Sequence, residues 1–489
     1  MTIPTAIDLF VFGWYLLLSV GYMTLCTFAI RAGRAELDRT RRRSFDAAAL
    51  CATPSQPAVS MLVPAHNERA SIELSLRGLL SQRWHNLETL VICNGCTDDT
   101  LEVLRVAFDL VPTADSFERG PSGVGQVRSS WASTTVPSLR VIDIGVGGKA
   151  DALNCGLERA RGTYVCTVDA DSLLAPDAVA HVILPFAEVG SDVVAVGSVV
   201  RVLNGAEVVD GRVVRPGMPR SWRARIQVVE YARGFHLGRA GWAEIGALPI
   251  ISGAFAAFRT SALRVAGGFR ADMIGEDMEV VLRLHDRFRP RRGRDSILFV
   301  PRPLCWTEVP EDAATLRRQR ERWQHGLLEA AKVHRRQVFG GGGTRVGRSA
   351  LPFVAVFEAY APLIELVGLA GIVIALILGQ LSAGGAAALL LFAVALGVLL
   401  SAVGILLEQV VGGHYLARPR DALILLSAAL LEQLGPRQRT AWWRLRALLG
   451  ARPSGTAGWD GMHHGGAAAV AGSATPRAWS VGEPGTTST

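Results

Sequence analysis

The stretch LRVIDIGVGGKADALNCGLERARGTYVCTVDAD, residues 139–171, decides the fold. It combines an apolar run at 139–144, a Gly-Gly turn, a helical pattern at 149–160 and a second apolar run at 163–168. Further apolar runs, each separated from the next by a helical pattern, lie at 58–63, 87–93 and 192–200. Apolar strands that alternate with helices predict a mainly parallel sheet covered by helices on both faces.

Two segments interrupt this alternation because they are rich in Pro, Ser and Gly: residues 110–137 and 204–221. We expect both to be surface insertions. Ligands of parallel sheets bind beyond the carboxyl ends of the strands. The polar residues that follow the strands are therefore the first candidates for a functional site.

Three apolar stretches outside this region are candidates to cross a membrane: residues 9–30, 362–380 and 385–407. Hydrophobic residues make up 49% of the chain and charged residues 19%. At ~1.5 Å per residue, stretches of this length span a hydrocarbon core of ~30 Å. The first stretch is uncharged, and no Lys or Arg precedes it, which favours a membrane helix over a signal peptide.

Arginines cluster directly after the first apolar stretch, between residues 31 and 43. The positive-inside rule then places the N-terminus outside and residues 31 to about 350 in the cytoplasm. The two later stretches bring Arg418 and Arg420 back inside, so we expect a multi-pass protein of the cell membrane. Because the arginines flank apolar segments, the net charge of +8 favours membrane lipid as a partner and not nucleic acid.

We expect no further spanning segment in the C-terminal region. Residues 421–434 are apolar but too short to cross, and 435–452 combine Trp442 and Trp443 with several arginines, which is typical of helices in the headgroup plane. The composition of residues 453–489 predicts a disordered tail. Seven cysteines give no disulfide framework, and the C-x-x-C pair of Cys93 and Cys96 has no second pair to form a zinc site.

Two groups of residues near the quoted stretch are suited to phosphate chemistry. Asp169 and Asp171 follow an apolar run, and two carboxylates on a tight turn can hold a divalent cation, Mg or Mn, that bridges substrate phosphates. Lys149 follows a glycine pair that opens a helix, where the backbone can approach a phosphate. The alternatives are a solvated acidic turn and a simple helix cap.

Glu276 and Asp277 form an acidic pair after Gly275, at the start of a predicted helix. Helix capping would explain both carboxylates. The functional interpretation is that Asp277 acts as a general base that removes a proton from an acceptor hydroxyl.

Gln319, Arg322 and Trp323 follow the spacing i, i+3 and i+4, so they share one helix face. An amide, a guanidinium and an indole together suit a pyrophosphate and a sugar ring. The alternative is a basic helix on the membrane surface, and we expect the neighbouring Arg317, Arg318 and Arg320 to face that surface.

Together, these groups resemble glycosyltransferase family 2, and within it the synthases of cellulose, chitin, hyaluronan and poly-N-acetylglucosamine. The shared elements are a Pro-x-x-Asn-Glu segment at 64–68, the D-x-D, the acidic pair and the Gln-x-x-Arg-Trp helix. The resemblance covers residues 57–330. It implies an α/β fold of the GT-A type, with a mainly parallel sheet and helices on both faces, plus transmembrane and interfacial helices.

The resemblance also implies a role for each matching residue. Donor-binding residues would be Pro64, Ala65, Glu68, Asn94, Lys149, Asp151, Asp169, Gln319 and Arg322. Asp171 would hold the metal together with Asp169. Asp277, preceded by Glu276, would be the base, and the acceptor would meet Ser252, Gly253 and Trp323. Asn94 departs from the aspartate that binds uracil in many relatives, so a UDP-linked donor is expected but the base stays open.

The expected division of the chain follows from these assignments. It comprises an N-terminal transmembrane helix (1–31), a basic juxtamembrane linker (32–56), a GT-A domain (57–310), the Gln-x-x-Arg-Trp helix with an interfacial helix (311–361), two transmembrane helices (362–408), a basic loop with interfacial amphipathic helices (409–452) and a disordered tail (453–489).

Three functions compete at this stage. The first is inverting transfer of a sugar from a nucleotide diphosphate sugar to a growing β-linked polysaccharide, on the cytoplasmic face. The second is transfer of one sugar to a membrane lipid, because three spans are few for a polymer channel unless an export partner or a homo-oligomer completes it. The third is a non-catalytic scaffold with the same fold, which the complete set of motifs disfavours.

Overall fold

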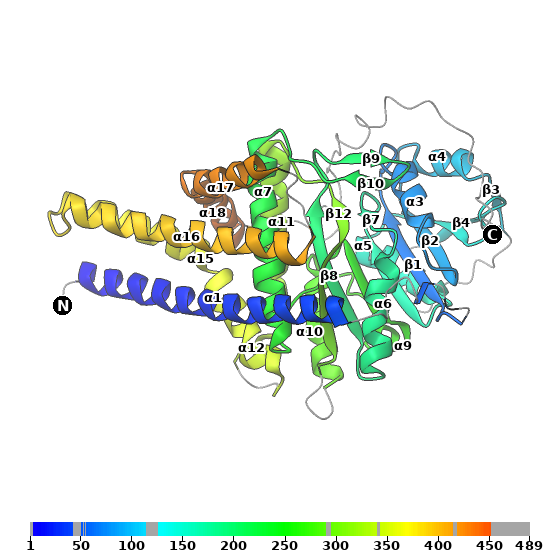
Figure 1. Cartoon of the computed structure of the whole chain (residues 1–489), viewed down its shortest axis with the longest axis horizontal. Helices are drawn as coiled ribbons and strands as arrows, with labels where there is room; N and C mark the ends of the chain where they lie inside the picture. Colours follow the sequence, from blue (N-terminus) through cyan, green and yellow to red (C-terminus); the bar gives the residue numbers. More distant parts are fainter. Residues whose placement is uncertain are drawn as a thin grey trace.

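The computed structural model describes residues 3–42, 50–51, 53, 55–113, 126–289, 295–339, 343–413 and 418–450. Its centre is a ten-stranded sheet with helices on both faces, and long helices extend from one side of it (Figure 1). The predicted tail at 453–489 and much of the predicted basic linker lie outside the described residues.

The sheet has the strand order β3-β4-β5-β2-β1-β6-β11-β8-β12-β7. In chain order its strands are β1 (Val59–Ala65), β2 (Leu87–Asn94), β3 (Leu110–Pro112), β4 (Val127–Ser133), β5 (Leu139–Ile144), β6 (Tyr164–Val168), β7 (Leu173–Leu174), β8 (Ala195–Val202), β11 (Phe255–Arg259) and β12 (Ile297–Thr307). The central strands β5, β2, β1 and β6 are parallel, and β11 runs antiparallel between β6 and β8. The predicted α/β fold with a mainly parallel sheet is confirmed.

Both predicted insertions contain strands. Residues 110–137 contribute β3 and β4 to the sheet, where β4 pairs with β5. Residues 204–221 contain the separate hairpin β9 (Glu207–Val209) and β10 (Arg212–Arg215). The first segment is therefore not only a surface insertion: it extends the sheet by two strands, which lie on either side of its Pro- and Gly-rich part.

Alternate side chains of the central strands enter two separate cores. Met61 and Val63 of β1 belong to one cluster of buried residues, and Leu62 belongs to the other. The helices that cover the sheet are α3 (Ile72–Leu80), α4 (Thr100–Ala107), α5 (Lys149–Arg159), α6 (Ala178–Val189), α9 (Thr260–Val265) and α10 (Glu276–Arg287). Burial on both faces explains why the strands read as continuous apolar runs.

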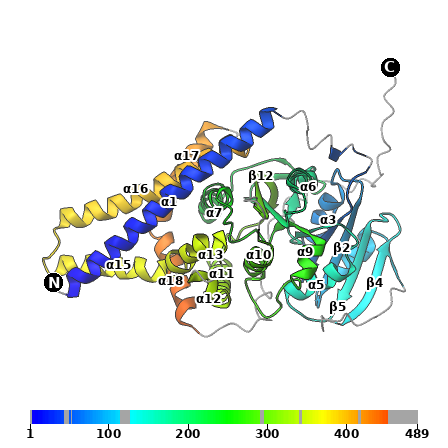
Figure 2. The same ribbon diagram turned by 90° about the horizontal axis from the view of Figure 1, so that it is seen from below.

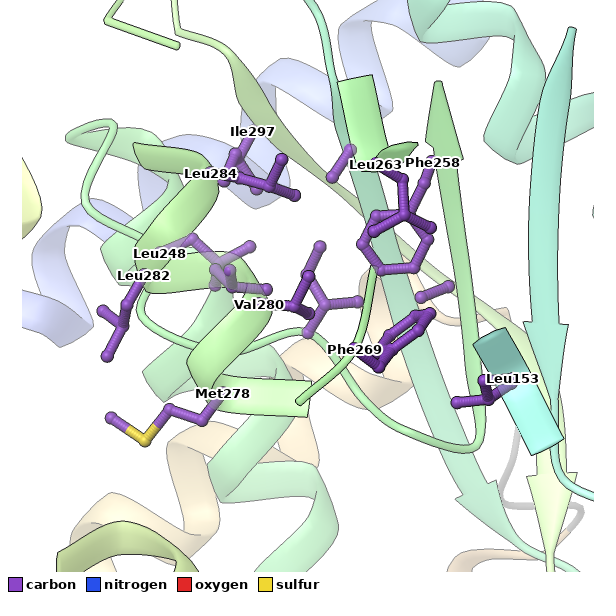
Figure 3. Close-up of a cluster of buried hydrophobic side chains, with 14 of the residues drawn as sticks. Leu153, Leu248, Phe258, Leu263, Phe269, Met278, Val280, Leu282, Leu284 and Ile297 are labelled. Atoms are coloured by element: carbon purple, nitrogen blue, oxygen red, sulfur yellow. The ribbon is translucent and has the colours of Figure 1, made fainter. Parts of the chain in front are cut away.

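The helix α10 is anchored through its apolar side. Figure 3 shows Met278, Val280 and Leu284 of this helix among the buried side chains of one core, with Phe258 and Phe269 nearby. These residues are at most 8% exposed. The first turn of α10, which carries the acidic pair, is therefore fixed by the core behind it.

The remaining helices lie on the other side of the molecule. They are α1 (Ile3–Arg42), α7 (Trp222–Ala232), the π-helical η1 (Arg233–Arg239), α8 (Ala240–Glu244), α11 (Ala313–Val333), α12 (Arg335–Val338), α13 (Arg345–Arg348), α14 (Ala350–Phe353), the π-helical η2 (Val354–Glu358), α15 (Ala361–Ile377), α16 (Ala383–Val411), α17 (Pro419–Gln433) and α18 (Pro436–Leu449). Figures 1 and 2 show α1, α15 and α16 projecting side by side from the sheet domain.

Within the described residues, Gly13–Arg39 of α1 and the whole of α16 are each long and apolar enough to cross a membrane. α15 meets the criterion only together with Ala350–Glu358, from which it is bent by 42°. The structure therefore offers two candidate spans, or three if the bent pair is one span. Exposed side chains such as Ile377, Leu391 and Phe392 suit a lipid environment.

The last helix, α18, packs against α11 and α15. Two of its arginines face these helices: Arg437 Nε lies 3.0 Å from Glu365 Oε1, and Arg444 Nε donates to Gln324 Oε1 at 2.8 Å. The composition of this segment predicts arginines that face lipid headgroups. Arg437 and Arg444 instead bind protein groups. The sequence pattern does not show these partners, because they come from helices distant in the sequence.

Candidate active site

The D-x-D lies in a tight turn directly after β6. This turn contacts the start of β11 and the end of β12. Asp169 N donates to Ala254 O at 3.2 Å, and Ser172 N donates to Asp169 O at 3.0 Å. The Asp169 carboxylate forms an ion pair with Lys149. Thr307 Oγ1 of β12 donates to Asp171 Oδ2 at 3.4 Å. The two carboxylates are therefore held separately, one towards α5 and the other towards β12.

Lys149 connects the D-x-D to the acidic pair. Its Nζ lies 3.9 Å from Glu276 Oε1, in addition to the contact with Asp169. Burial disfavours the charge on Lys149, but the surrounding carboxylates outweigh it and raise the pKa of this ammonium. Lys149 is consequently cationic at neutral pH.

The acidic pair begins α10, after the N-cap Gly275. Met278 N donates to Asp277 Oδ1 at 2.8 Å, which orients the carboxylate. Burial raises the pKa of Glu276 to about 7, and the Lys149 ammonium opposes this shift. Burial also raises the pKa of Asp277, again against Lys149. Both carboxyl groups are thus more basic than free ones.

A small cleft unites these groups with the predicted acceptor segment. It is lined by Lys149, Leu153, Thr167, Ile251, Ser252, Gly253, Ala256, Phe258, Phe269, Glu276 and Asp277. A β-carbon on Gly253 would stand 3.3 Å from both Asp277 Oδ2 and Lys149 Nζ. Gly253 therefore keeps the approach to Asp277 open, because any side chain there would crowd the Asp277 carboxylate.

The Pro64–Glu68 segment and the Asn94–Asp98 segment form one shelf at the ends of β1 and β2. Pro64 and Ala65 are buried in the last part of β1. Asn67 Oδ1 accepts a hydrogen bond from Thr97 N at 2.8 Å, and His66 Nδ1 lies 2.7 Å from Asn94 O. Glu68 N donates to Thr100 Oγ1 at 2.8 Å. These hydrogen bonds connect the chain after β1 to the chain after β2.

Asn94 supports the glycine turn and does not face the cleft. It is fully buried, its Nδ2 donates to Gly147 O and Gly148 O at 2.9 and 2.8 Å, and its Oδ1 accepts from Gly147 N at 2.8 Å. Asp151 holds the same turn, since its Oδ2 accepts from Gly148 N at 2.7 Å. Direct contact of either side chain with a donor would require breaking these bonds.

The helix α11 carries the Gln-x-x-Arg-Trp residues as predicted. Gln319 is buried, and its Oε1 finds no hydrogen-bond partner among the described residues. Burial raises the pKa of Glu276, and Arg322 lies close enough to oppose this rise, more weakly than Lys149 does. Trp323 is 44% exposed. Neither Arg322 nor Asp171 lines the small cleft.

Arg320 does not face the membrane surface, which corrects the expectation for this side chain. It forms an ion pair with Glu230 of α7, and its guanidinium lies 4.7 Å from the centre of the Trp323 ring. Only 11% of the side chain is exposed. The helical spacing showed a basic face, but Glu230 is too distant in the sequence to be anticipated as the partner.

Arg239 is a candidate that sequence reasoning missed. It ends η1, it lies over the Phe235 ring at 3.9 Å, and its buried Nε has no partner among the described residues. Burial lowers the pKa of this guanidinium, while Asp277 acts in the opposite direction. Arg239 belongs to none of the motifs of the sequence, so only the fold shows that it lies near Asp277.

The D-x-D fits a divalent cation that takes most of its ligands from elsewhere. No group of three or more His, Cys, Asp or Glu side chains in the described part of the chain could hold a metal ion alone. Asp169 and Asp171 supply two carboxylates on one turn, and a cation of the Mg type completes its shell with water and substrate phosphates. The donor set therefore suits a cation that arrives with its substrate.

The mixed sheet, with carboxylates at the ends of its strands, has the GT-A fold of a solved glycosyltransferase. Residues 130–326 match the family model described as "Glycosyltransferase like family 2". The chain therefore carries a family 2 glycosyltransferase domain, and this region contains Lys149, the D-x-D, Asp277 and Trp323.

Known proteins agree with this assignment. A poly-beta-1,6-N-acetyl-D-glucosamine synthase of Staphylococcus epidermidis is 29% identical over 269 residues, which are 55% of this chain and 54% of that protein. The corresponding synthase of Staphylococcus aureus strain COL is 27% identical over the same shares. The chain thus spans about half the length of the curated relatives it matches.

One solved structure shares the fold over most of the chain. It is a mannosyltransferase from Pyrobaculum calidifontis in complex with GDP-Man and Mn2+, and the match covers 84% of this chain and 99% of that one. The TM-score is 0.50 and the sequence identity 21%, so the likeness concerns the fold alone.

Proposed function

We propose that the protein is an inverting glycosyltransferase that moves a sugar from a nucleotide diphosphate sugar to a growing β-linked polysaccharide. The observation that carries this proposal is the position of Lys149 between Asp169 and Glu276, with Gly253 leaving Asp277 open. The synthase names of the two staphylococcal relatives support a polysaccharide product. A UDP-linked N-acetylhexosamine is accordingly the first donor to test.

Asp277 is the general base of the proposed reaction. Its carboxylate takes the proton of the acceptor hydroxyl while the hydroxyl oxygen forms a bond to the anomeric carbon. The bond from that carbon to the diphosphate breaks on the opposite face, and the diphosphate leaves with the electron pair. Because burial raises the pKa of Asp277, its carboxylate is a stronger base than an exposed aspartate.

The charge that develops on the diphosphate needs fixed positive partners. Lys149 and Arg322 are assigned this role, and Gln319 is assigned to the same end of the site. A divalent cation, Mg or Mn, would be held by Asp171 and Asp169 and would neutralise the diphosphate oxygens. The Mn2+ in the mannosyltransferase of the same fold supports this cofactor.

The remaining roles follow from position. Pro64, Ala65 and Glu68 are assigned to the nucleoside, whereas Asn94 and Asp151 act through the glycine turn that they hold. Ser252, Gly253 and Trp323 are assigned to the acceptor. We further propose that the catalytic domain is cytoplasmic and that an export partner or a second copy accompanies a polymer product.

Transfer of a single sugar to a membrane lipid is the second candidate. The observation that favours it is the number of candidate spans, two or up to three among the described residues, which is few for a polymer channel. The size of the product separates the two functions. A polymer remains at the origin of a thin-layer plate, and a glycolipid migrates.

The test uses the full-length protein in detergent with radiolabelled UDP-GlcNAc, UDP-glucose or GDP-mannose and either Mg or Mn. We expect cation-dependent release of the nucleotide diphosphate and a labelled product. Asp277→Asn should still bind the donor but transfer sugar about 10²–10⁴-fold more slowly. Transfer at the wild-type rate by this variant would exclude Asp277 as the base.

A further inference from the structure

Gln324, the residue after Trp323, joins three elements on the membrane side of the catalytic domain. It is only 1% exposed. Its Nε2 donates to Ala359 O, after η2, at 2.9 Å, and its Oε1 accepts from Arg444 Nε of α18 at 2.8 Å. Arg444 also donates through Nη2 to Glu358 O at 2.8 Å. One amide and one guanidinium thus connect α11, η2 and α18.

Apolar packing alone would leave the rotation of α11 against α18 weakly determined. α18 packs against α11, and Ala441 and Leu445 of α18 are buried. Apolar side chains of similar size tolerate small shifts, whereas a planar guanidinium binds two acceptors only in one orientation. Because burying a charged group is costly unless it is hydrogen-bonded, Arg444 indicates a geometric requirement at this contact.

Rotation of α11 would move two functional contacts at once. Trp323 precedes Gln324, so the two side chains point to adjoining faces of the helix. Gly326 follows two residues later and lies against Gly275, the residue before the acidic pair. The hydrogen bonds of Gln324 therefore fix both the exposed indole and the backbone contact behind Glu276 and Asp277.

We propose that Arg444, acting through Gln324, is a positioning residue that sets the rotation of α11 so that Trp323 faces the acceptor. The inference rests on the proposed function, because it takes Trp323 as the acceptor platform. The C-terminal helix α18 is thereby part of the acceptor site, although it follows the candidate spans in the sequence. The donor contacts assigned to β1, β2 and α5 lie outside this contact, whereas Gln319 and Arg322 lie on α11 and would move with it.

The experiment compares Arg444→Met and Gln324→Leu with Arg446→Met, which removes an exposed arginine of the same helix. All are purified as full-length protein in detergent, with melting temperature and gel filtration as checks of folding. Two rates are measured: sugar transfer as a function of acceptor concentration, and hydrolysis of UDP-GlcNAc or whichever nucleotide sugar proves active, without acceptor.

We expect Arg444→Met and Gln324→Leu each to raise the acceptor KM about 10- to 100-fold, because small misplacements have effects of this size. Hydrolysis of the donor should fall less than transfer, because only Gln319 and Arg322 among the assigned donor residues lie on α11, and Arg446→Met should change neither quantity. The double variant should be no worse than either single one, because both lose the same interaction. Gln324→Glu, which can still accept from Arg444, should recover much of the acceptor affinity.

Three results would overturn the proposal: an unchanged acceptor KM in Arg444→Met, equal losses of transfer and hydrolysis, or additive effects in the double variant. If Arg444→Met fails to fold, the comparison of Gln324→Glu with Gln324→Leu decides by the same criteria. Trp323→Ala tests separately the assumption that Trp323 binds the acceptor. An unchanged acceptor KM in that variant would refute the acceptor role of Trp323 itself, whatever Arg444 does.

Discussion

Gly275 and Gly326 meet backbone to backbone, where α11 crosses the start of α10. A β-carbon on Gly326 would stand 3.0 Å from the Cα atom of Gly275, and one on Gly275 would stand 2.8 Å from Gly326 O. The helix that carries Trp323 and the turn that carries Asp277 are thus in direct contact. Only a hydrogen atom fits on either side of this contact.

Gly326→Ala should separate α11 from the acidic pair. The added methyl group has no space, so the backbone must shift, at a cost in unfolding free energy of about 1–3 kcal/mol. We expect kcat for sugar transfer to fall at least about tenfold, because Asp277 and Arg322 move apart. Steady-state kinetics and thermal unfolding would measure both effects.

Gly234→Ala is the matched control for this substitution. Gly234 lies in η1, and apart from its chain neighbours and the adjacent helix backbone no described atom comes within 4 Å of the position that its β-carbon would take. We expect wild-type kinetics from this variant. If Gly326→Ala also retained wild-type kcat, the contact between α10 and α11 would not matter for catalysis.

Removal of the divalent cation should stop sugar transfer. EDTA is expected to abolish nucleotide release, and Mg or Mn should restore it. Asp171→Asn should lower kcat by about 10²–10³ and raise the cation concentration needed for half-maximal rate, because one anionic ligand is lost. Asp210→Asn is the control: Asp210 is exposed in the β9-β10 hairpin at a positive φ of 48°, which asparagine also tolerates.

The cation assignment would be wrong if EDTA-treated protein kept its full rate. It would also be wrong if Asp171→Asn and Asp210→Asn responded alike to titration with Mn. The first outcome would point to Lys149 and Arg322 as the only charges that neutralise the diphosphate.

The sequence predicted one pair of neighbours in the site, because the ends of parallel strands meet at one edge of a sheet. Lys149 after β5 and Asp169 after β6 were expected near each other on this ground, and they form an ion pair. Asp277 could be added only through its motif, since β11 and α10 are far from β6 in the chain. Apolar periodicity could not reveal that β11 runs antiparallel, because burial looks the same in both directions.

Side-chain partners from distant segments were beyond sequence reasoning. The Asn94 amide could equally bind a base or a backbone, and only the fold shows that it binds Gly147 and Gly148. Arg320 and Arg444 belong to basic helices, whose arginines a pattern assigns to lipid. Their actual partners, Glu230 and Gln324, lie 90 and 120 residues away.

Glu276 should make stability fall as pH rises through the mildly acidic range. Its pKa is about 7 in the folded protein, raised by burial from an ordinary value of 4.5. Between these values the folded state binds more protons than the unfolded state, so unfolding free energy declines with increasing pH. Glu276→Gln removes this term and should raise the melting temperature at pH 8 but not at pH 4.

Thermal unfolding in detergent, without donor or cation, measures this difference. Glu207→Gln provides the control, because Glu207 is exposed in the β9 strand and should change stability little at either pH. A melting temperature of Glu276→Gln that followed the wild type at every pH would show that Glu276 titrates normally.

Cys96 should be the most reactive thiol near the shelf formed by the Pro64–Glu68 and Asn94–Asp98 segments. A hydrogen bond from Cys93 lowers the pKa of Cys96 to about 7, whereas Cys93 is fully buried and its own pKa is raised. Alkylation of Cys96 by iodoacetamide should therefore increase with a midpoint near pH 7, because the thiolate is the nucleophile. Mass spectrometry would follow the modification, and Cys93→Ala should move the midpoint to higher pH.

A bound nucleotide should slow the alkylation of Cys96, since Cys96 lies between the Pro64–Glu68 segment and Asp98. If Cys96 were alkylated at the same rate with and without saturating nucleotide, the nucleoside would bind elsewhere.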